Sequence, residues 1–439
     1  MSFNLLALIH VGASDCMVWQ PSTPLHRCLP AMVIANATLS GHALKEHARE
    51  VLQRTKEFRT GIRPYFWYGQ TNITIEELWI GHFCCSPEKP LLIGRFVPLF
   101  VQWNTIMQHS KRCCSPDATK HEAMQQHLVA TLKSLLRPDV LYVTITTNDD
   151  GPWLNAHPRI PLTRFRFWPW PMTPFPSILT LSAGGVGHVP LPLLGPKILG
   201  PQAQELAQGN PSSRRKGEQL FVSIAGAPTR PAECGTEEAL LWFNMELAAH
   251  PLRREINDTL NGEGVQGPEL ISWWARRTSD KLLLRGSPHS ALNRTRFWVL
   301  PRGHGRNTFL LAEAMQYGVL PVYMWDDIPW LPYRELWERG ELGWHTHYGG
   351  IVPLIKSLAM VDELELKRRR SSTLHHAHHY TAAGVLANIE KFVSSDGAHG
   401  PLRCEPFGPL NNDGFHVREP VAYGVLASKM HAACAAQTT

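Results

Sequence analysis

The sequence of 439 residues lacks a hydrophobic run long enough to cross a membrane. Residues 5–11 are apolar, but a spanning helix needs about 20 such residues, and no basic segment precedes this run. Charged residues make up only 18% of the chain and hydrophobic residues 44%, a balance that excludes an intrinsically disordered protein. The chain is long enough for two domains, each with its own core.

Cysteine spacing and basic clusters exclude two further classes of protein. The nine cysteines include the adjacent pairs Cys84-Cys85 and Cys113-Cys114, and they form neither the paired CxxC spacing of a zinc site nor a disulfide scaffold. Apart from residues 367–370, no block of lysine and arginine dominates the net charge of +6, so we expect no nucleic-acid partner. This mild positive balance suits phosphorylated donors or acidic glycans.

Four histidines gather in one segment, at His375, His376, His378 and His379. A metal site is one interpretation of such a cluster, but no carboxylate or thiol accompanies it at a regular spacing. We therefore expect a polar helix surface here, and we assign no metal ligands in the chain.

The pattern around which the chain is organised is residues 298–333, which read as strand, loop, helix and strand. A β-prone apolar run ends at a proline, and a basic loop with two glycines follows it. Thr308 is a good N-cap for the next helix, and Gly318 lies just beyond the end of that helix. In order, the predicted elements are a strand at 297–300, a loop at 302–307, a helix at Phe309–Tyr317 and a strand at 320–324.

This arrangement predicts a phosphate site at the loop. Backbone N–H groups and the positive end of a helix dipole favour an anion at a helix N-terminus. Glu313 lies about one and a half turns into the helix, where it can reach a ribose hydroxyl. The expected nucleotide-binding side chains are Arg302, Arg306, Thr308, Glu313, Asp326 and Asp327. A purely structural βαβ unit, with these charges solvated, is the alternative interpretation.

The run P-R-G-H-G-R-N-T-F-x-x-x-E-A-M-x-x-G-V-L-P-V, residues 301–322, resembles the donor-site signature of exostosin-type glycosyltransferases. The continuation D-D-I-P-W-L-P-Y is similar to family members from algae and other protists. The resemblance implies an α/β protein of the GT-B architecture, in which two Rossmann-like domains face a cleft. It also implies inverting transfer of a sugar from a UDP-sugar to the hydroxyl of a glycan or glycoprotein acceptor, without a metal or other cofactor.

The resemblance adds further donor-binding candidates and one departure. Arg230 falls where family members carry an arginine near the donor phosphates, although an exposed loop arginine is the alternative interpretation; His304 is a further candidate. Some exostosins have an arginine two residues after the cap residue, where this chain has Leu310. Either Arg306 supplies that charge from the loop, or phosphate binding is weaker here.

A base must take the acceptor proton in an inverting transfer. The β-rich run 140–147 stops at Asn148-Asp149-Asp150-Gly151, and sites in α/β proteins lie beyond the carboxyl ends of strands. We therefore expect Asp149 or Asp150 to be the base, with His188 as the next candidate because it takes the place of an acid in the family pattern. A plain Asx turn at residues 148–151 is the alternative.

The predicted domain organisation follows from shifts in composition along the chain. A polar segment with Gln, Ser, Pro and Arg-Arg-Lys separates two α/β regions and reads as a linker. The expected parts are an irregular segment at 1–30, an acceptor-side Rossmann-like domain at 31–199, the linker at 200–219, a nucleotide-sugar donor domain at 220–393 and a loose tail at 394–439.

Exostosin-type enzymes are usually anchored in the Golgi by an N-terminal helix, which implies the lumen of the Golgi or secretory pathway. This chain has no clear anchor, so membrane association would depend on a missing or weak N-terminal segment. Four Asn-x-Ser/Thr triplets, at Asn36, Asn72, Asn257 and Asn293, permit secretory passage.

Two rival functions remain. One is a non-catalytic glycan- or nucleotide-binding protein that keeps the exostosin fold. The other is a Rossmann-type oxidoreductase, which is disfavoured because no G-x-G-x-x-G follows a strand.

Overall fold

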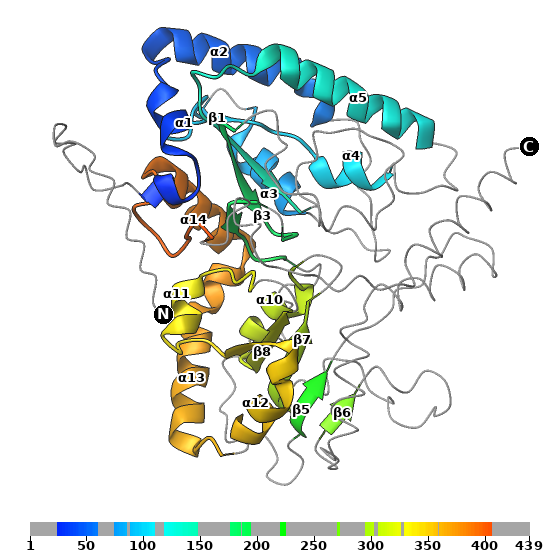
Figure 1. The fold of residues 1–439 in the computed structure, drawn as a ribbon, viewed down its shortest axis with the longest axis vertical. Helices are drawn as coiled ribbons and strands as arrows, with labels where there is room; N and C mark the ends of the chain where they lie inside the picture. Colours follow the sequence, from blue (N-terminus) through cyan, green and yellow to red (C-terminus); the bar gives the residue numbers. More distant parts are fainter. Residues whose placement is uncertain are drawn as a thin grey trace, which may run out of the picture.

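The computed structural model describes residues 24–59, 74–85, 88–109, 118–147, 176–185, 187–194, 220–224, 270–272, 295–302, 306–325, 329–358 and 360–405. Within these ranges the chain is a mixed α/β protein with two sheets of parallel strands (Figure 1). One sheet is built before the predicted linker and the other after it. The linker itself, residues 200–219, lies outside the described residues.

The first sheet has four parallel strands in the order β1-β2-β3-β4. Its strands are β1 (Val97–Pro98), β2 (Tyr142–Thr146), β3 (Ile178–Ser182) and β4 (Val189–Pro190). The helices of this part are α1 (Ala31–Asn36), α2 (Gly41–Arg54), α3 (Ile75–Phe83), α4 (Trp103–His109) and α5 (Ala118–Leu135), with short 3-10 turns at Pro24–Arg27 and Lys56–Phe58. Thr74 caps α3 through a reciprocal pair of bonds with Glu77, a signal that the sequence carries as Thr-Ile-Glu-Glu.

The second sheet has five parallel strands in the order β6-β5-β7-β8-β9. They are β5 (Leu220–Ile224), β6 (Leu270–Ser272), β7 (Thr295–Pro301), β8 (Leu320–Trp325) and β9 (Trp344–His347). The helices are α10 (Phe309–Tyr317), α11 (Arg334–Glu338), α12 (Ile351–Leu358), α13 (Glu363–His376) and α14 (Ala382–Ser394), with 3-10 turns at Tyr348–Gly350 and Ala377–Tyr380.

The order of the second sheet contains a topological switch point. The chain passes from β5 to β6 on one side and then returns to place β7 on the other side of β5. In open parallel sheets the crevice beyond the carboxyl ends of the strands at such a point is where ligands bind. The loop that leaves β7 is therefore at the position in the sheet where a ligand is expected.

Strand β7 is buried on both faces, as strands of a parallel sheet usually are. Phe297 and Val299 pack with α12 and the start of α13, whereas Trp298 and Leu300 belong to a larger cluster that includes α10. That larger cluster also holds residues of β2 and β3, so one hydrophobic core runs from the second sheet to the first. Helix α14 completes this link, because it packs against α3 (Figure 1).

The two chain ends of the described region are better packed than we expected. Residues 24–30 were predicted to be irregular, yet Leu25 and Leu29 are buried in the core. Residues 394–439 were predicted to be a loose tail, yet Leu402 is buried and Cys404 forms a disulfide with Cys28. At these described residues both predictions were wrong, because the packing partners are remote in the chain: Cys28 and Cys404 are separated by 376 positions. The remaining parts of the two segments, 1–23 and 406–439, lie outside the described residues.

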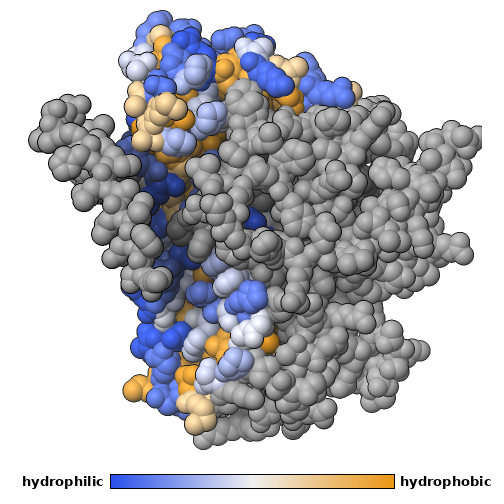
Figure 2. Space-filling view, in the orientation of Figure 1, coloured by the Kyte–Doolittle hydropathy of each residue, from blue (hydrophilic) through white to orange (hydrophobic). Residues whose placement is uncertain are grey.

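The surface of the described residues is mostly hydrophilic on the face drawn in Figure 2, with small scattered hydrophobic areas. The large hydrophobic side chains that are exposed are Met32, Met360 and Leu364. None of the helices in the described part of the chain has the length and hydrophobicity that a membrane-spanning helix requires.

Candidate active site

The candidate phosphate loop leaves β7 and enters α10 as the sequence predicts. Strand β7 lies between β5 and β8, and the backbone N–H of Arg302 donates to the carbonyl of Met324 across to β8, 3.1 Å away. Thr308 is the N-cap of α10, and its side chain accepts from the backbone N–H of Leu310. Gly318 ends the helix in the left-handed conformation, with φ of 61°. The predicted bounds of this helix are confirmed.

Of six further predicted donor-site residues, two lie within the described part of the chain and four lie outside it. Arg302 lies at the carboxyl end of β7 and is only 9% exposed. Glu313 is half-buried on α10. The pKa of Tyr317 is raised first by the burial of Tyr317 itself and second by the negative charge of Glu313. Arg230, His304 and the pair Asp326-Asp327 lie outside the described residues.

Arg306 joins the loop after β7 to the loop after β3 in the first sheet. Its backbone N–H donates to the carbonyl of Gly184 at 2.9 Å, and its Nη1 donates to the carbonyl of Gly185 at 2.9 Å. Its own carbonyl accepts from the hydroxyl of Tyr323 on β8. The carboxyl-end loops of the two sheets therefore meet at this residue.

Asn307 and Trp330 make two more bonds between the same parts. The Nδ2 of Asn307 donates to the carbonyl of Leu191, just after β4, at 2.9 Å. The Nε1 of Trp330, in the loop after β8, donates to the carbonyl of Ser182 at 3.2 Å. We call this set of contacts the seam: Ser182, Gly184, Gly185 and Leu191 on one side, and Arg306, Asn307 and Trp330 on the other. Neither Asn307 nor Trp330 was predicted as a site residue.

Gly185 makes the close approach at the seam possible. Its φ is +119°, and a Cβ at this position would lie 2.5 Å from the Cβ of Arg306 and 2.6 Å from its backbone nitrogen. Gly185→Ala is therefore expected to lower the free energy of unfolding by about 2 kcal/mol, since overpacking and an unfavourable φ act together. Urea unfolding followed by fluorescence measures this change.

The matched control is Gly81→Ala, because Gly81 lies in α3 and a Cβ there meets nothing within 4 Å. The control variant is expected to be as stable as the wild type or slightly more stable, because alanine favours a helix. Equal unfolding midpoints for Gly185→Ala and the wild type would show that the seam is not packed as described.

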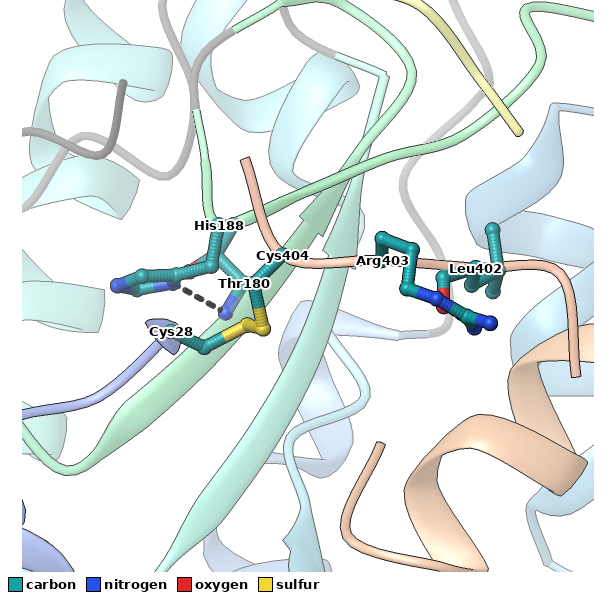
Figure 3. The surroundings of a disulfide bond; sticks show 6 residues. All are labelled: Cys28, Thr180, His188, Leu402, Arg403 and Cys404. Atoms are coloured by element: carbon teal, nitrogen blue, oxygen red, sulfur yellow. Dashed lines mark hydrogen bonds between the residues drawn. A yellow bond between two sulfur atoms is a disulfide. The ribbon is translucent and has the colours of Figure 1, made fainter. Parts of the chain in front are cut away.

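His188 is buried and hydrogen-bonded to the backbone, an environment that suits a structural role better than proton transfer. Its Nδ1 accepts from the backbone N–H of Thr180 at 2.9 Å, so the neutral ring carries its proton on Nε2. Burial lowers the pKa of His188 to about 4. Figure 3 shows this ring beside the Cys28–Cys404 disulfide. This bonding disfavours His188 as the catalytic base, because its one lone pair is already in use.

Asp149 and Asp150 lie outside the described residues. Thr147, the last described residue before them, is held by hydrogen bonds to Glu76. This carboxylate of α3 is 1% exposed and accepts from the backbone N–H of Thr147 at 2.7 Å and of Asn104 at 3.0 Å. Burial raises the pKa of Glu76 to about 7, against the opposing effect of these hydrogen bonds. Sequence reasoning missed Glu76, since its partners are remote in the chain.

Residues 400–405 form a strap that joins the region of His188 to helix α11. The backbone N–H of Glu405 donates to the carbonyl of His188 at 2.9 Å, and its carboxylate pairs with Arg334 of α11. Arg403 binds Glu335 of α11, with Nε to Oε1 at 2.6 Å. Figure 3 shows Cys404 joined to Cys28 while the side chains of Leu402 and Arg403 extend away from the disulfide.

The sequence predicts that the histidine cluster lies on a polar helix surface. His375 and His378 are exposed, whereas His376 and His379 are partly buried. His376 binds Glu341 through Nε2 at 2.8 Å, and its ring stacks on that of His379. Burial first, and the neighbouring histidines next, lower the pKa of His379 to about 4. Within the described ranges, no group of three or more His, Cys, Asp or Glu side chains is arranged to hold a metal ion.

The described carboxyl ends of the second sheet bring together Arg302 at β7, Trp325 at β8 and His347 at β9. The rings of Trp325 and His347 meet edge to face, 5.2 Å apart. No family model matches the sequence, and no curated protein matches it. The resemblance to exostosin-type glycosyltransferases, which is strongest at residues 301–322, therefore stays a prediction.

Proposed function

We propose that this protein is a glycosyltransferase that moves a sugar from a UDP-sugar to a hydroxyl of a glycan or glycoprotein, with inversion and without a metal or cofactor. The observation that carries the proposal is the place of the Arg302 loop. It leaves β7 beside the topological switch point and leads into the capped N-terminus of α10. A GT-B arrangement, with two Rossmann-like domains around a cleft, is the finer fold that this proposal requires.

The chemistry of the step sets what the donor side must supply. Breaking the glycosidic bond to UDP leaves negative charge on the diphosphate, and fixed positive groups lower the barrier if they are already in place. Arg302 is largely buried, and a charge interacts more strongly with an anion in a poorly solvated place. The first turn of α10 adds N–H groups and the helix dipole. Arg306 and His304 are further donor ligands, Glu313 binds the ribose, and Arg230, Asp326 and Asp327 complete the set.

The acceptor side supplies the base. Asp149 or Asp150 follows β2, whose carboxyl end lies in the first sheet, next to β3 and its seam loop. Either carboxylate would take the proton from the acceptor hydroxyl as that oxygen attacks the anomeric carbon and the bond to UDP breaks. His188 is a weaker candidate for this role, given its bond from Thr180.

Two features fit a protein of the secretory pathway, which we propose as its location, with the Golgi lumen as the compartment. Disulfides such as Cys28–Cys404 form and persist in oxidising compartments. Asn36, the first residue of an Asn-Ala-Thr triplet, is exposed at the end of α1, as a glycosylation acceptor must be.

Arg302→Ala is the variant that tests the function. We expect its turnover of a UDP-sugar to fall about a hundredfold, because a charge aimed at the leaving diphosphate is lost. UDP release is measured with UDP-glucose, UDP-galactose, UDP-xylose and UDP-N-acetylglucosamine, and UDP affinity by calorimetry. Arg339→Ala removes an arginine that is 53% exposed and serves as the matched control.

Arg302→Lys keeps a positive charge and separates loss of chemistry from loss of folding. Full turnover by Arg302→Ala would refute the assignment of this residue. UDP binding by the wild type without any turnover would favour the non-catalytic binding protein. A wild type that binds no nucleotide would refute the proposed function.

A further inference from the structure

The seam carries an inference that goes beyond the donor and acceptor groups and rests on the proposed function. We propose that Asn307 and Trp330 are positioning residues, which hold the donor loop in register with the first sheet and thereby set the rate of sugar transfer. These two residues affect the alignment of the sugar donor with the acceptor and do not affect the affinity for UDP. The observation behind the proposal is that both residues are 2% exposed and that each donates one side-chain hydrogen bond across the seam.

Asn307 is suited to this role because both ends of its amide are engaged in different parts of the protein. Its Oδ1 accepts from the backbone N–H of Thr308 at 2.8 Å, at the cap of α10. Its Nδ2 donates to the carbonyl of Leu191 in the first sheet region. A reversed amide would set donor against donor and acceptor against acceptor, so the orientation follows from the network. One rigid side chain thus ties the helix cap to the other sheet.

Trp330 holds the segment that follows β8 against the same part of the first sheet. Its acceptor, the carbonyl of Ser182, also accepts from the backbone N–H of Leu191 at 2.8 Å. The acceptors used by Trp330 and Asn307 are therefore linked to each other by a hydrogen bond. Asn307 follows β7 and Trp330 follows β8, which are neighbouring strands of the second sheet. The segments that follow these two strands therefore bind to the same part of the first sheet.

The physical consequence is a dependence of the reaction on the seam. Transfer requires the donor's anomeric carbon, held by the second sheet, to lie about 3 Å from an acceptor oxygen activated from the first sheet. A shift of about 1 Å between the two costs about a hundredfold in rate. UDP contacts only the donor side in the proposed site, so its affinity does not depend on this register. Loss of a seam bond therefore lowers kcat and leaves UDP binding unchanged.

Trp330→Phe is the sharpest variant, because it keeps one aromatic ring while it removes the Nε1 donor; it also shortens the side chain by one ring, a change that the control variant shares. Its matched control is Trp337→Phe: Trp337 is 4% exposed and its Nε1 donates to the carbonyl of Pro332 at 3.2 Å, a bond that does not cross the seam. Asn307→Ala is the second test variant. Trp330→Phe and Trp337→Phe each lose one buried indole donor, so a general loss of stability affects these two alike; Asn307→Ala loses the Nδ2 donor and also the Oδ1 acceptor of the Thr308 N–H.

The experiment measures kcat for UDP release from the four UDP-sugars with a panel of neutral and acidic oligosaccharides as acceptors, and the dissociation constant of UDP by calorimetry. We expect Trp330→Phe and Asn307→Ala to lower kcat about tenfold or more while UDP affinity stays within about twofold, and Trp337→Phe to keep both values. Equal kcat in Trp330→Phe, Asn307→Ala and Trp337→Phe would overturn the proposal. So would a parallel loss of UDP affinity in the two seam variants.

Failure of the proposed function gives a different result. In that case the wild type itself neither binds UDP nor releases it from a UDP-sugar, and the positioning role falls with the reaction. If the wild type turns over and only the seam variants fail to differ from Trp337→Phe, the glycosyltransferase assignment stands and the positioning role alone is refuted.

Discussion

Glu76→Leu is expected to lower the free energy of unfolding by about 3–5 kcal/mol, one of the two largest effects that we predict. The carboxylate of Glu76 accepts from the backbone N–H groups of Thr147 and Asn104 and from the hydroxyl of Thr147. Leucine fills a similar volume but accepts nothing, so buried donors lose their partner. Each unsatisfied buried donor costs about 1–3 kcal/mol. Urea unfolding at neutral pH, monitored by tryptophan fluorescence, measures the loss.

Glu76→Gln separates the charge of Glu76 from its role as an acceptor. The folded-state pKa is raised from 4.5 to about 7, so between these values the folded protein binds a proton that the unfolded chain has released. This contribution to stability is present below pH 4.5 and is lost as pH rises through 7. Relative to the glutamine variant, the wild type should lose up to about 3 kcal/mol over that window.

His188 titrates in the opposite direction, because its lowered pKa makes the folded state lose stability as pH falls from 6.5 to about 4. Both proteins keep His188, so its effect cancels in the difference between wild type and Glu76→Gln. A difference that does not change between pH 4.5 and pH 8 would contradict the raised pKa of Glu76.

Local chemistry explains what the sequence could predict. The strand, loop and helix around Arg302 are set by near neighbours: Thr308 caps α10 and Gly318 ends it. The same kind of signal was present at Thr74 and Glu77, which form the capping box of α3. Burial on both faces of β7 was also foreseeable, since its residues are apolar without alternation.

Contacts between remote residues explain what the sequence could not predict. Asn307 and Leu191 are 116 positions apart, and Trp330 and Ser182 are 148 apart. No periodicity or motif connects such pairs in a single sequence. Glu76 resembles any acid in the first turn of a helix until α3 is placed against the exit of β2. For the same reason the seam was missed even though its glycines, Gly184 and Gly185, stand in the sequence.

Within the candidate site, the sequence indicated the donor side better than the acceptor side. The donor-side candidates from Arg302 to Thr308 lie within one short stretch of sequence, so residue types and spacing suffice to suggest an anion site. The acceptor side draws on separate segments, and the two aspartates at 149 and 150 were chosen only because they follow a strand. His188 was chosen by position in a pattern, and its bond from Thr180 was invisible in that pattern.

Removal of the Cys28–Cys404 disulfide by Cys28→Ser with Cys404→Ser is expected to lower the free energy of unfolding by about 3–5 kcal/mol. The bond closes a loop of 376 positions, so the unfolded chain gains much conformational freedom when it is lost. The strap also loosens, since Glu405 binds the carbonyl of His188 and pairs with Arg334 on α11. Chemical unfolding without reductant measures the stability, and mass spectrometry after alkylation verifies the bond in the wild type.

The single variants make this prediction specific to the disulfide. Either serine alone breaks the same bond, so Cys28→Ser, Cys404→Ser and the double variant should all lose about the same free energy. Additive losses would mean that the two cysteines act independently, and rapid alkylation of both thiols in the native wild type would mean that no bond forms. Because the strap holds α11 and the carbonyl of His188 together, protease sensitivity should rise in the part of the chain after α14 before the core unfolds. Early cleavage within the core instead would show that the strap does not open as a local unit.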